Sequence, residues 1–138
     1  MSRASTSDDG LVTLPSSHDF ATTLGRLTAA LEAKGLAIFA RIDHAAGAAN
    51  VGMALRPTTL IVFGNPAGGT PLMQAAQTAG IDLPLKALVW QDSDGTVHVT
   101  YNDPAWIAAR HRLGDGAAHA VAAMTSALDG LARHATGA

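Results

Sequence analysis

The chain has 138 residues, the length of one domain, and no cysteine, so disulfides, thiolate metal sites and a cysteine nucleophile are excluded. Apolar residues make up 48% of the sequence but aromatic residues only 4%, which predicts a core of Leu, Val, Ile and Ala. The net charge of -2 gives no electrostatic basis for binding nucleic acid or an anionic membrane. The apolar runs are shorter than the ~18–20 residues that a membrane span needs, and no secretory signal is visible, so we expect a cytoplasmic protein.

The N-terminal third predicts a tail, a strand and a helix. Residues 1–10 are predicted to form a flexible tail, and residues 11–138 a single domain. Residues 11–14 are apolar and predict a strand. An apolar stripe at helical period follows, with Ser16-Ser17 as its expected cap and Gly35 as its expected end.

The next segments surround the most apolar strand of the chain. Residues 36–42 predict a strand, and Asp43 is expected to cap a short Ala-rich helix that ends at Gly52. Residues 58–63 are rich in β-branched side chains and almost free of polar ones. We therefore expect this strand in the interior of the sheet or at a subunit interface.

The C-terminal half alternates further helices and strands. Thr70-Pro71 predicts a helix start, because proline is favoured at the first helical position. Strands are predicted over residues 86–91 and 96–101, joined by a hairpin at residues 92–95. Asp103-Pro104 predicts another helix start.

The last predicted helix has an apolar stripe, which consists of Val121, Met124, Leu128 and Leu131. Helices between strands, followed by a tight hairpin, predict an α+β domain with one mixed or antiparallel sheet and helices packed on it in two layers.

The turn Gly64-Asn65-Pro66 is the first candidate site. Pro66 favours an extended backbone at Asn65, which lets the Asn65 amide point into a cleft, although a plain turn explains the same residues. Residues 67–70 precede the helix start predicted at Thr70-Pro71, where free N–H groups can hold an anion. The segment is neither a Walker loop nor a dinucleotide fingerprint.

Other polar residues are candidates for the same cleft or for structural roles. His44 is either a ligand or proton carrier, or a surface residue beside the cap Asp43. Lys86 either neutralises a carboxylate near the cleft or protects an edge strand. Tyr101 and His98 are expected on opposite faces of one strand. The histidines have no HExxH or i, i+4 spacing, so no metal site is predicted.

Several of these segments, in this order, resemble a known family. They are Ile42-Asp43-His44-Ala45-Ala46, Leu55-Arg56-Pro57, Phe63-Gly64-Asn65-Pro66 and Asp82-Leu83-Pro84-Leu85-Lys86, with Asp94-Gly95, Tyr101 and Pro104 after them. The series is similar to the bacterial and archaeal family called domain of unknown function 302, from about Asp19 to Leu113. The resemblance implies a compact α+β domain, commonly a homodimer, and a shared cleft with polar contacts from Asp43, His44, Asn65, Lys86 and Tyr101. It does not specify an activity, and the cofactor stays unknown.

The leading hypothesis is a small-molecule binding or sensing domain with its pocket at Gly64-Asn65-Pro66. A second hypothesis is an enzyme that uses His44 as general acid or base, which requires His44 and Asn65 to share one cleft. A third is a protein–protein interaction module, which an apolar patch without a polar pocket favours.

Overall fold

A computed structural model describes residues 5–6 and 9–137. The strands are β1 (Ser5–Thr6), β2 (Leu11–Pro15), β3 (Ala37–Asp43), β4 (Thr58–Gly64), β5 (Leu85–Gln91) and β6 (Val97–Asn102). The helices are α1 (Phe20–Ala33), α2 (His44–Asn50), α3 (Pro66–Ala75), α4 (Pro104–His111) and α5 (Ala118–Thr136), with short 3-10 helices η1 (Gln77–Ile81) and η2 (Asp115–Ala117).

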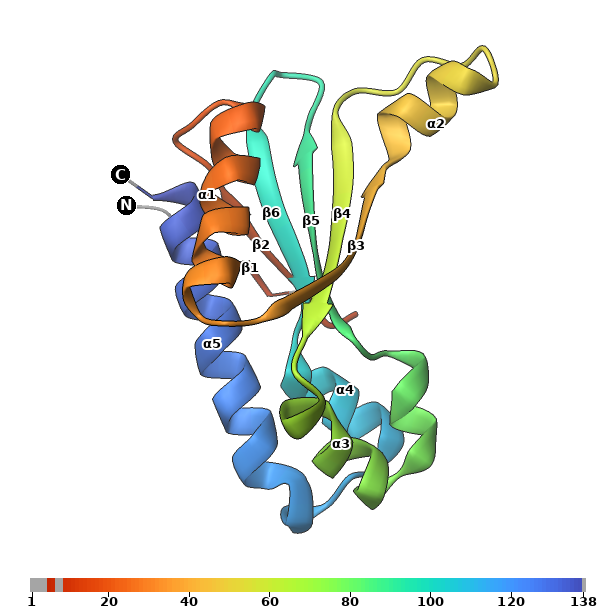
Figure 1. The fold of residues 1–138 in the computed structure, drawn as a ribbon, viewed down its shortest axis with the longest axis vertical. Helices are drawn as coiled ribbons and strands as arrows, with labels where there is room; N and C mark the ends of the chain where they lie inside the picture. The colour runs from red at the N-terminus through yellow and green to blue at the C-terminus, as the bar shows by residue number, and fades with distance from the viewer. Residues whose placement is uncertain (1–4, 7–8, 138) are drawn as a thin grey trace.

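The strands pair in the order β1-β2-β6-β5-β4-β3, and every neighbouring pair is antiparallel. Helices α1 and α5 lie side by side over one face of this sheet, and α3 and α4 lie at one of its ends (Figure 1). The predicted α+β class is confirmed, and the sheet is the antiparallel alternative. Strand β4 has neighbours on both sides, so its predicted interior position is confirmed.

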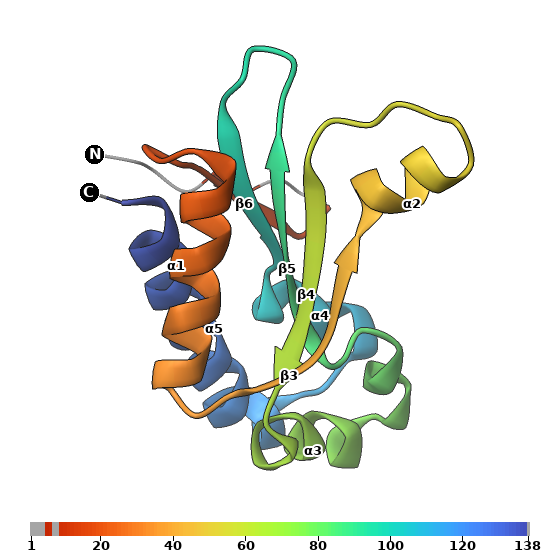
Figure 2. The ribbon, with the colours of Figure 1, turned by 45° about the horizontal axis from the view of Figure 1, so that its top comes forward.

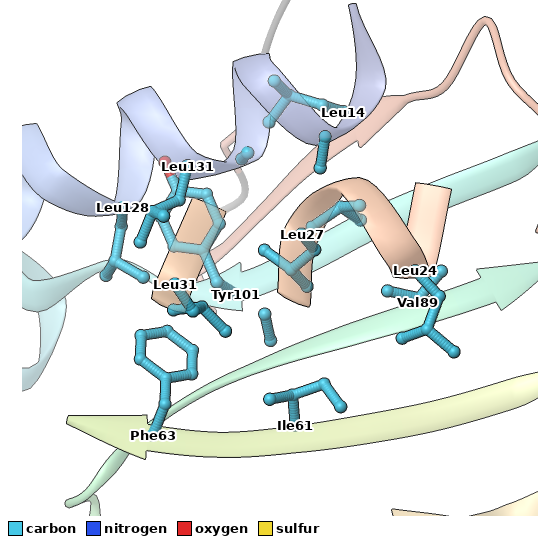
Figure 3. Close-up of a cluster of buried hydrophobic side chains, with 14 of the residues drawn as sticks. Leu14, Leu24, Leu27, Leu31, Ile61, Phe63, Val89, Tyr101, Leu128 and Leu131 are labelled. Carbon is cyan, nitrogen blue, oxygen red and sulfur yellow. The ribbon is translucent and has the colours of Figure 1, made fainter. Parts of the chain in front are cut away.

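The core fills the space between the sheet and helices α1 and α5. Alternate side chains of β2, β4, β5 and β6 point to this layer, as the period of two requires. On β6 these are Val97, Val99 and Tyr101, while His98 points to the other face as predicted. The labelled side chains in Figure 3 come from β2, β4, β5, β6, α1 and α5 and meet in one apolar cluster. Burial of this layer is the main favourable term in folding.

Part of the predicted N-terminal tail belongs to the sheet. Residues 5–6 form β1, which pairs with β2, so the predicted tail is wrong at this point. Gly10 is buried and its carbonyl accepts a hydrogen bond from the N–H of Asp103 at 2.7 Å. This contact fixes the chain to the start of α4 just before β2. Residues 1–4 and 7–8 of the predicted tail lie outside the described residues.

Two helices begin at residues other than the predicted ones. Asp19, and not Ser16-Ser17, caps α1, and its Oδ1 accepts the N–H of Thr22 at 2.8 Å. Helix α3 begins at Pro66 with Asn65 as its cap, and Pro71 lies inside the helix. Asn65-Pro66 carries the same cap-and-proline signal as Thr70-Pro71, and the chain uses the first of the two.

The opposite face of the sheet, called the outer face here, carries half-buried side chains that include Lys86, Leu88 and Trp90 on β5. Beside it, α2 and the loop after it extend away from the body of the domain (Figures 1 and 2). None of the residues of α2 is buried. Val51 is 73% exposed and Met53 is 67% exposed. The sheet therefore has one covered face and one that the described helices leave accessible.

Candidate functional site

The predicted turn at the end of β4 forms the start of α3 and one wall of a cavity. Asn65 has an extended backbone, and its Oδ1 accepts the N–H of Ala67 at 2.9 Å. Its carbonyl accepts the N–H groups of Gly68 and Gly69 at 2.8 and 3.1 Å. The first N–H groups of this helix are therefore bonded within the turn. An anion has no free donors at these positions, which argues against the anion site considered from the sequence.

The cavity has a volume of about 690 Å³ and lies between α3, the N-terminal part of α5 and the ends of β4 and β5. Its wall is mostly apolar, and Met73, Leu83 and Met124 supply long flexible or branched side chains. Pairing between β3 and β4 is irregular between Ile38 and Ala40. Such a bulge redirects the side chain at its centre. Here that side chain is Phe39, which is 54% exposed and lines the cavity.

Polar side chains are few around this space. Asn65, Thr70 and His119 line it, and all three are exposed at its rim. Glycines line the same region, and a Cβ at Gly68 would meet the Met124 methyl at 3.9 Å, an ordinary contact distance. The site therefore presents an apolar interior and a weakly polar mouth, and none of the described residues that line it is an aspartate, glutamate, lysine or arginine.

Of the predicted contacts, only Asn65 lines this cavity. Asp43 caps α2 as predicted, and its Oδ1 accepts the N–H of Ala46 at 2.9 Å. His44 is exposed on the first turn of α2. In the β3–β4 ladder Asp43 pairs with Thr59, whereas the cavity end of β4 is at Gly64. The enzyme hypothesis requires His44 and Asn65 to share one cleft, and the structure does not bring them together.

Lys86 and Tyr101 lie on opposite faces of the sheet. Lys86 donates to the carbonyls of Asp82 and Pro84 at 3.3 and 3.4 Å. Since β5 lies between β4 and β6, the edge-strand interpretation of Lys86 is wrong. Tyr101 is 6% exposed and points to the helices. Burial, and then the negative charges of Asp129 and Asp103, raise the pKa of Tyr101 to about 12.

Most of the chain matches a known protein family. Residues 12–131 match the family described as Domain of unknown function DUF302. The chain belongs to the DUF302 family. The resemblance found in the sequence motifs is thereby confirmed. The fold is also similar to the crystal structure of an uncharacterized conserved DUF302 protein from Bacillus stearothermophilus, with a TM-score of 0.81. That likeness covers 91% of this chain and 98% of the other at 17% identity, and it concerns the fold alone.

Curated relatives of this DUF302 chain carry the name of a membrane protein. Proteins named fluoride-specific ion channel FluC 1, from Brucella suis biovar 1 and Brucella abortus biovar 1, are each 47% identical to it over 134 residues. The match covers 97% of this chain but 53% and 50% of those proteins, so the chain spans about half their length. Within residues 5–6 and 9–137, no helix is both long and apolar enough to cross a membrane.

Sequence reasoning missed a polar network at the same end of the DUF302 fold. The Asp82 carboxylate accepts from Arg110 at 3.1 and 3.2 Å and contacts Nε2 of His111 at 2.6 Å. Nδ1 of His111 lies 2.9 Å from the Thr78 hydroxyl. These residues do not line the cavity beside Asn65, and they connect η1 to α4. We assign them a structural role. Asp82 and His111 are far apart in sequence, so no local pattern joins them.

The outer face also has polar contacts around Trp90. The rings of Trp90 and His98 stack with centroids 4.4 Å apart, and the Trp90 N–H donates to the Thr100 hydroxyl at 2.9 Å. Nε2 of His98 lies 2.8 Å from Oδ2 of Asp92. This hydrogen bond lowers the pKa of Asp92. Tight contacts between neighbouring strands thus give the outer face a fixed, partly aromatic surface.

Proposed function

We propose that this DUF302 chain is a binding domain for an uncharged, largely apolar small molecule. The observation that carries the proposal is the cavity beside Gly64-Asn65-Pro66, with its volume of about 690 Å³ and its mostly apolar wall. Ligand sites of this kind typically measure about 300–1,000 Å³ and have a few polar groups that orient the ligand. Asn65, Thr70 and His119 line the cavity and would supply such groups.

The chemistry of the wall supports a neutral ligand over an anion. The N–H groups of Ala67, Gly68 and Gly69 already have partners, and no lysine or arginine lines the cavity within the described part of the chain. An anion would therefore lose its hydration without gaining a compensating charge. Met73 on α3 and Met124 on α5 both line the cavity. Their flexible thioethers can adapt to ligands of different shape.

Binding of the neutral fluorescent probe N-phenyl-1-naphthylamine tests this proposal. We expect saturable fluorescence enhancement with the native chain. The Gly68→Leu variant, whose side chain projects toward Met124, is expected to bind roughly tenfold more weakly or worse, because losing about 1.4 kcal/mol of contact is a factor of ten. Gly130→Leu is the matched control, because a Cβ at Gly130 meets nothing within 4 Å and Gly130 does not line the cavity. Equal binding by both variants, with native-like circular dichroism, would exclude this cavity as the site.

We also propose that the domain is a homodimer, with a second copy against the outer face and the α2 segment. The family resemblance supports this proposal. So do exposed apolar side chains near this surface, which are Ile42 on β3 and Val51, Met53 and Leu55 after α2. A seven-residue helix without buried residues is marginal on its own, so a partner that covers it would stabilise it. A two-fold contact places the same surface on both copies.

Native mass spectrometry tests the dimer with a pair of matched substitutions. Ile42 is 41% exposed on β3, and Ile81 is 75% exposed on η1 at the other end of the fold. We expect the native chain and Ile81→Lys to be dimers and Ile42→Lys to be a monomer, since a buried unpaired ammonium opposes association. A monomeric native chain, or a dimer that persists in Ile42→Lys, contradicts this interface.

A second candidate function comes from the relatives. Because the chain is 47% identical to half of the proteins named fluoride-specific ion channel FluC 1, we propose that DUF302 domains of this type act beside a fluoride channel. We also propose that this domain lies in the cytoplasm. Fluoride efflux from liposomes should differ between the full Brucella suis relative and a version that lacks the matched half. Identical efflux rates at equal channel density would count against an accessory role.

A further inference from the structure

The Tyr101 hydroxyl has no hydrogen-bond partner among the described residues, although most of its side chain is buried. Tyr101 is 6% exposed, and its ring packs in the main core. Its oxygen lies at the end of the ring that points from β6 toward α5 (Figure 3). No hydrogen bond joins it to any residue in the described part of the chain. Phenylalanine would fill the same core space without placing a hydroxyl there, so this hydroxyl is available to a partner from outside the chain.

Tyr101 lines a second cavity, on the far side of α5 from the first. This cavity has a volume of about 730 Å³ and lies between β2, β6, α4 and α5. Its walls include Val12, Val121 and several alanines, and its polar end is formed by Tyr101, Asp103 and Asp129. The remaining exposure of Tyr101 is toward this space.

The charges at the polar end favour a cation. Asp103 uses Oδ1 to cap α4, accepting the N–H of Ala105 at 2.9 Å, and its other oxygen has no bond among the described residues. Asp129 is paired with Arg133 at 2.9 Å, and both side chains are about half exposed. Two carboxylates thus face the site with one guanidinium. Their charges, together with burial, raise the pKa of Tyr101 to about 12, so the phenol stays protonated at neutral pH.

We propose that this second cavity binds a small organic cation of the alkylammonium class. The ammonium group donates to the Tyr101 oxygen and to the Asp103 and Asp129 carboxylates, and the alkyl part lies against Val12 and Val121. Hydrogen bonds to a charged group are stronger than neutral ones, and an anion of the same shape would meet two negative charges. This inference is independent of the proposed apolar site, because the two cavities share no lining residue.

Nuclear magnetic resonance with n-butylammonium chloride tests the site directly. The chain has one tyrosine, so ring-labelled tyrosine gives signals from Tyr101 alone. We expect a saturable shift of these signals with n-butylammonium at neutral pH and none with the isosteric pentanoate. Calorimetry should show binding weakened roughly tenfold or more in Tyr101→Phe, the range expected for a hydrogen bond to a charged group. Asp129→Asn should weaken it in the same direction.

Asp94→Asn is the matched control, because it removes the same charge from the exposed hairpin. It is expected to leave binding unchanged. Tyr101→Phe should melt at or above the native temperature, since it removes a hydroxyl that lacks a partner in the chain. If n-butylammonium gives no saturable shift, or binds Tyr101→Phe and Asp129→Asn as tightly as the native chain, water alone occupies the cavity and the proposal fails.

Discussion

Replacing Gly10 by alanine is expected to lower the free energy of unfolding by roughly 2–5 kcal/mol, the sum of a left-handed backbone cost and an overpacking cost. Gly10 has a φ of 84°, and a Cβ there would lie 2.4 Å from Cγ and Cδ2 of Trp106. The indole cannot move freely, because the Arg110 guanidinium lies 5.7 Å from its ring centre and Gly10 itself accepts the Asp103 N–H. Urea denaturation of both proteins measures the difference.

Gly35→Ala separates the two costs. Gly35 also has a positive φ, of 70°, but a Cβ there meets nothing within 4 Å. It should therefore show only the backbone cost, roughly 1–2 kcal/mol. Adding Trp106→Ala to Gly10→Ala should recover the remaining part, which a double-mutant cycle isolates. If Gly10→Ala and Gly35→Ala cost the same, the packing of Trp106 on Gly10 does not hold the N-terminal segment in place.

Elements with strong local signals were predictable from the sequence. The stripe of α1, the hairpin with Gly95 at a φ of 85° and the Asp103 cap of α4 are all found where expected. Each depends on the chemistry of a few neighbouring residues. The start of α3 was not predictable, because Asn65-Pro66 and Thr70-Pro71 carry equivalent signals. Complete burial of Leu72 shows that packing at the end of the sheet holds the helix together across Pro71.

The candidate site was predictable only in part. The turn at Asn65 was identified from backbone chemistry, and it does line the first cavity. His44 and Lys86 do not line it, because their places depend on strand order and register, which arise from contacts distant in sequence. Alternation correctly separated His98 from Tyr101, since that rule concerns one strand. Nothing local indicates that Tyr101 would face a different cavity from Asn65.

Truncating Leu27 is expected to cost about 2–5 kcal/mol of unfolding free energy, as is typical for a fully buried leucine replaced by alanine. Leu27 lies in the middle of α1, is 1% exposed and points toward the sheet among the clustered side chains (Figure 3). Alanine has the highest helix propensity, so the helix itself is not weakened by the change. The loss therefore measures the packing of α1 on the sheet.

Ile81→Ala provides the comparison on the surface. Ile81 is 75% exposed, and its substitution removes an aliphatic side chain of similar size. Its effect should stay within about 0.5 kcal/mol in the same urea experiment. Helix α1 packs against α5 and the sheet, and it belongs neither to the wall of the second cavity nor to the proposed dimer surface. Below its melting temperature, Leu27→Ala should therefore still dimerise and bind n-butylammonium. A loss below about 1 kcal/mol would mean that α1 is not held by the buried layer that the structure shows.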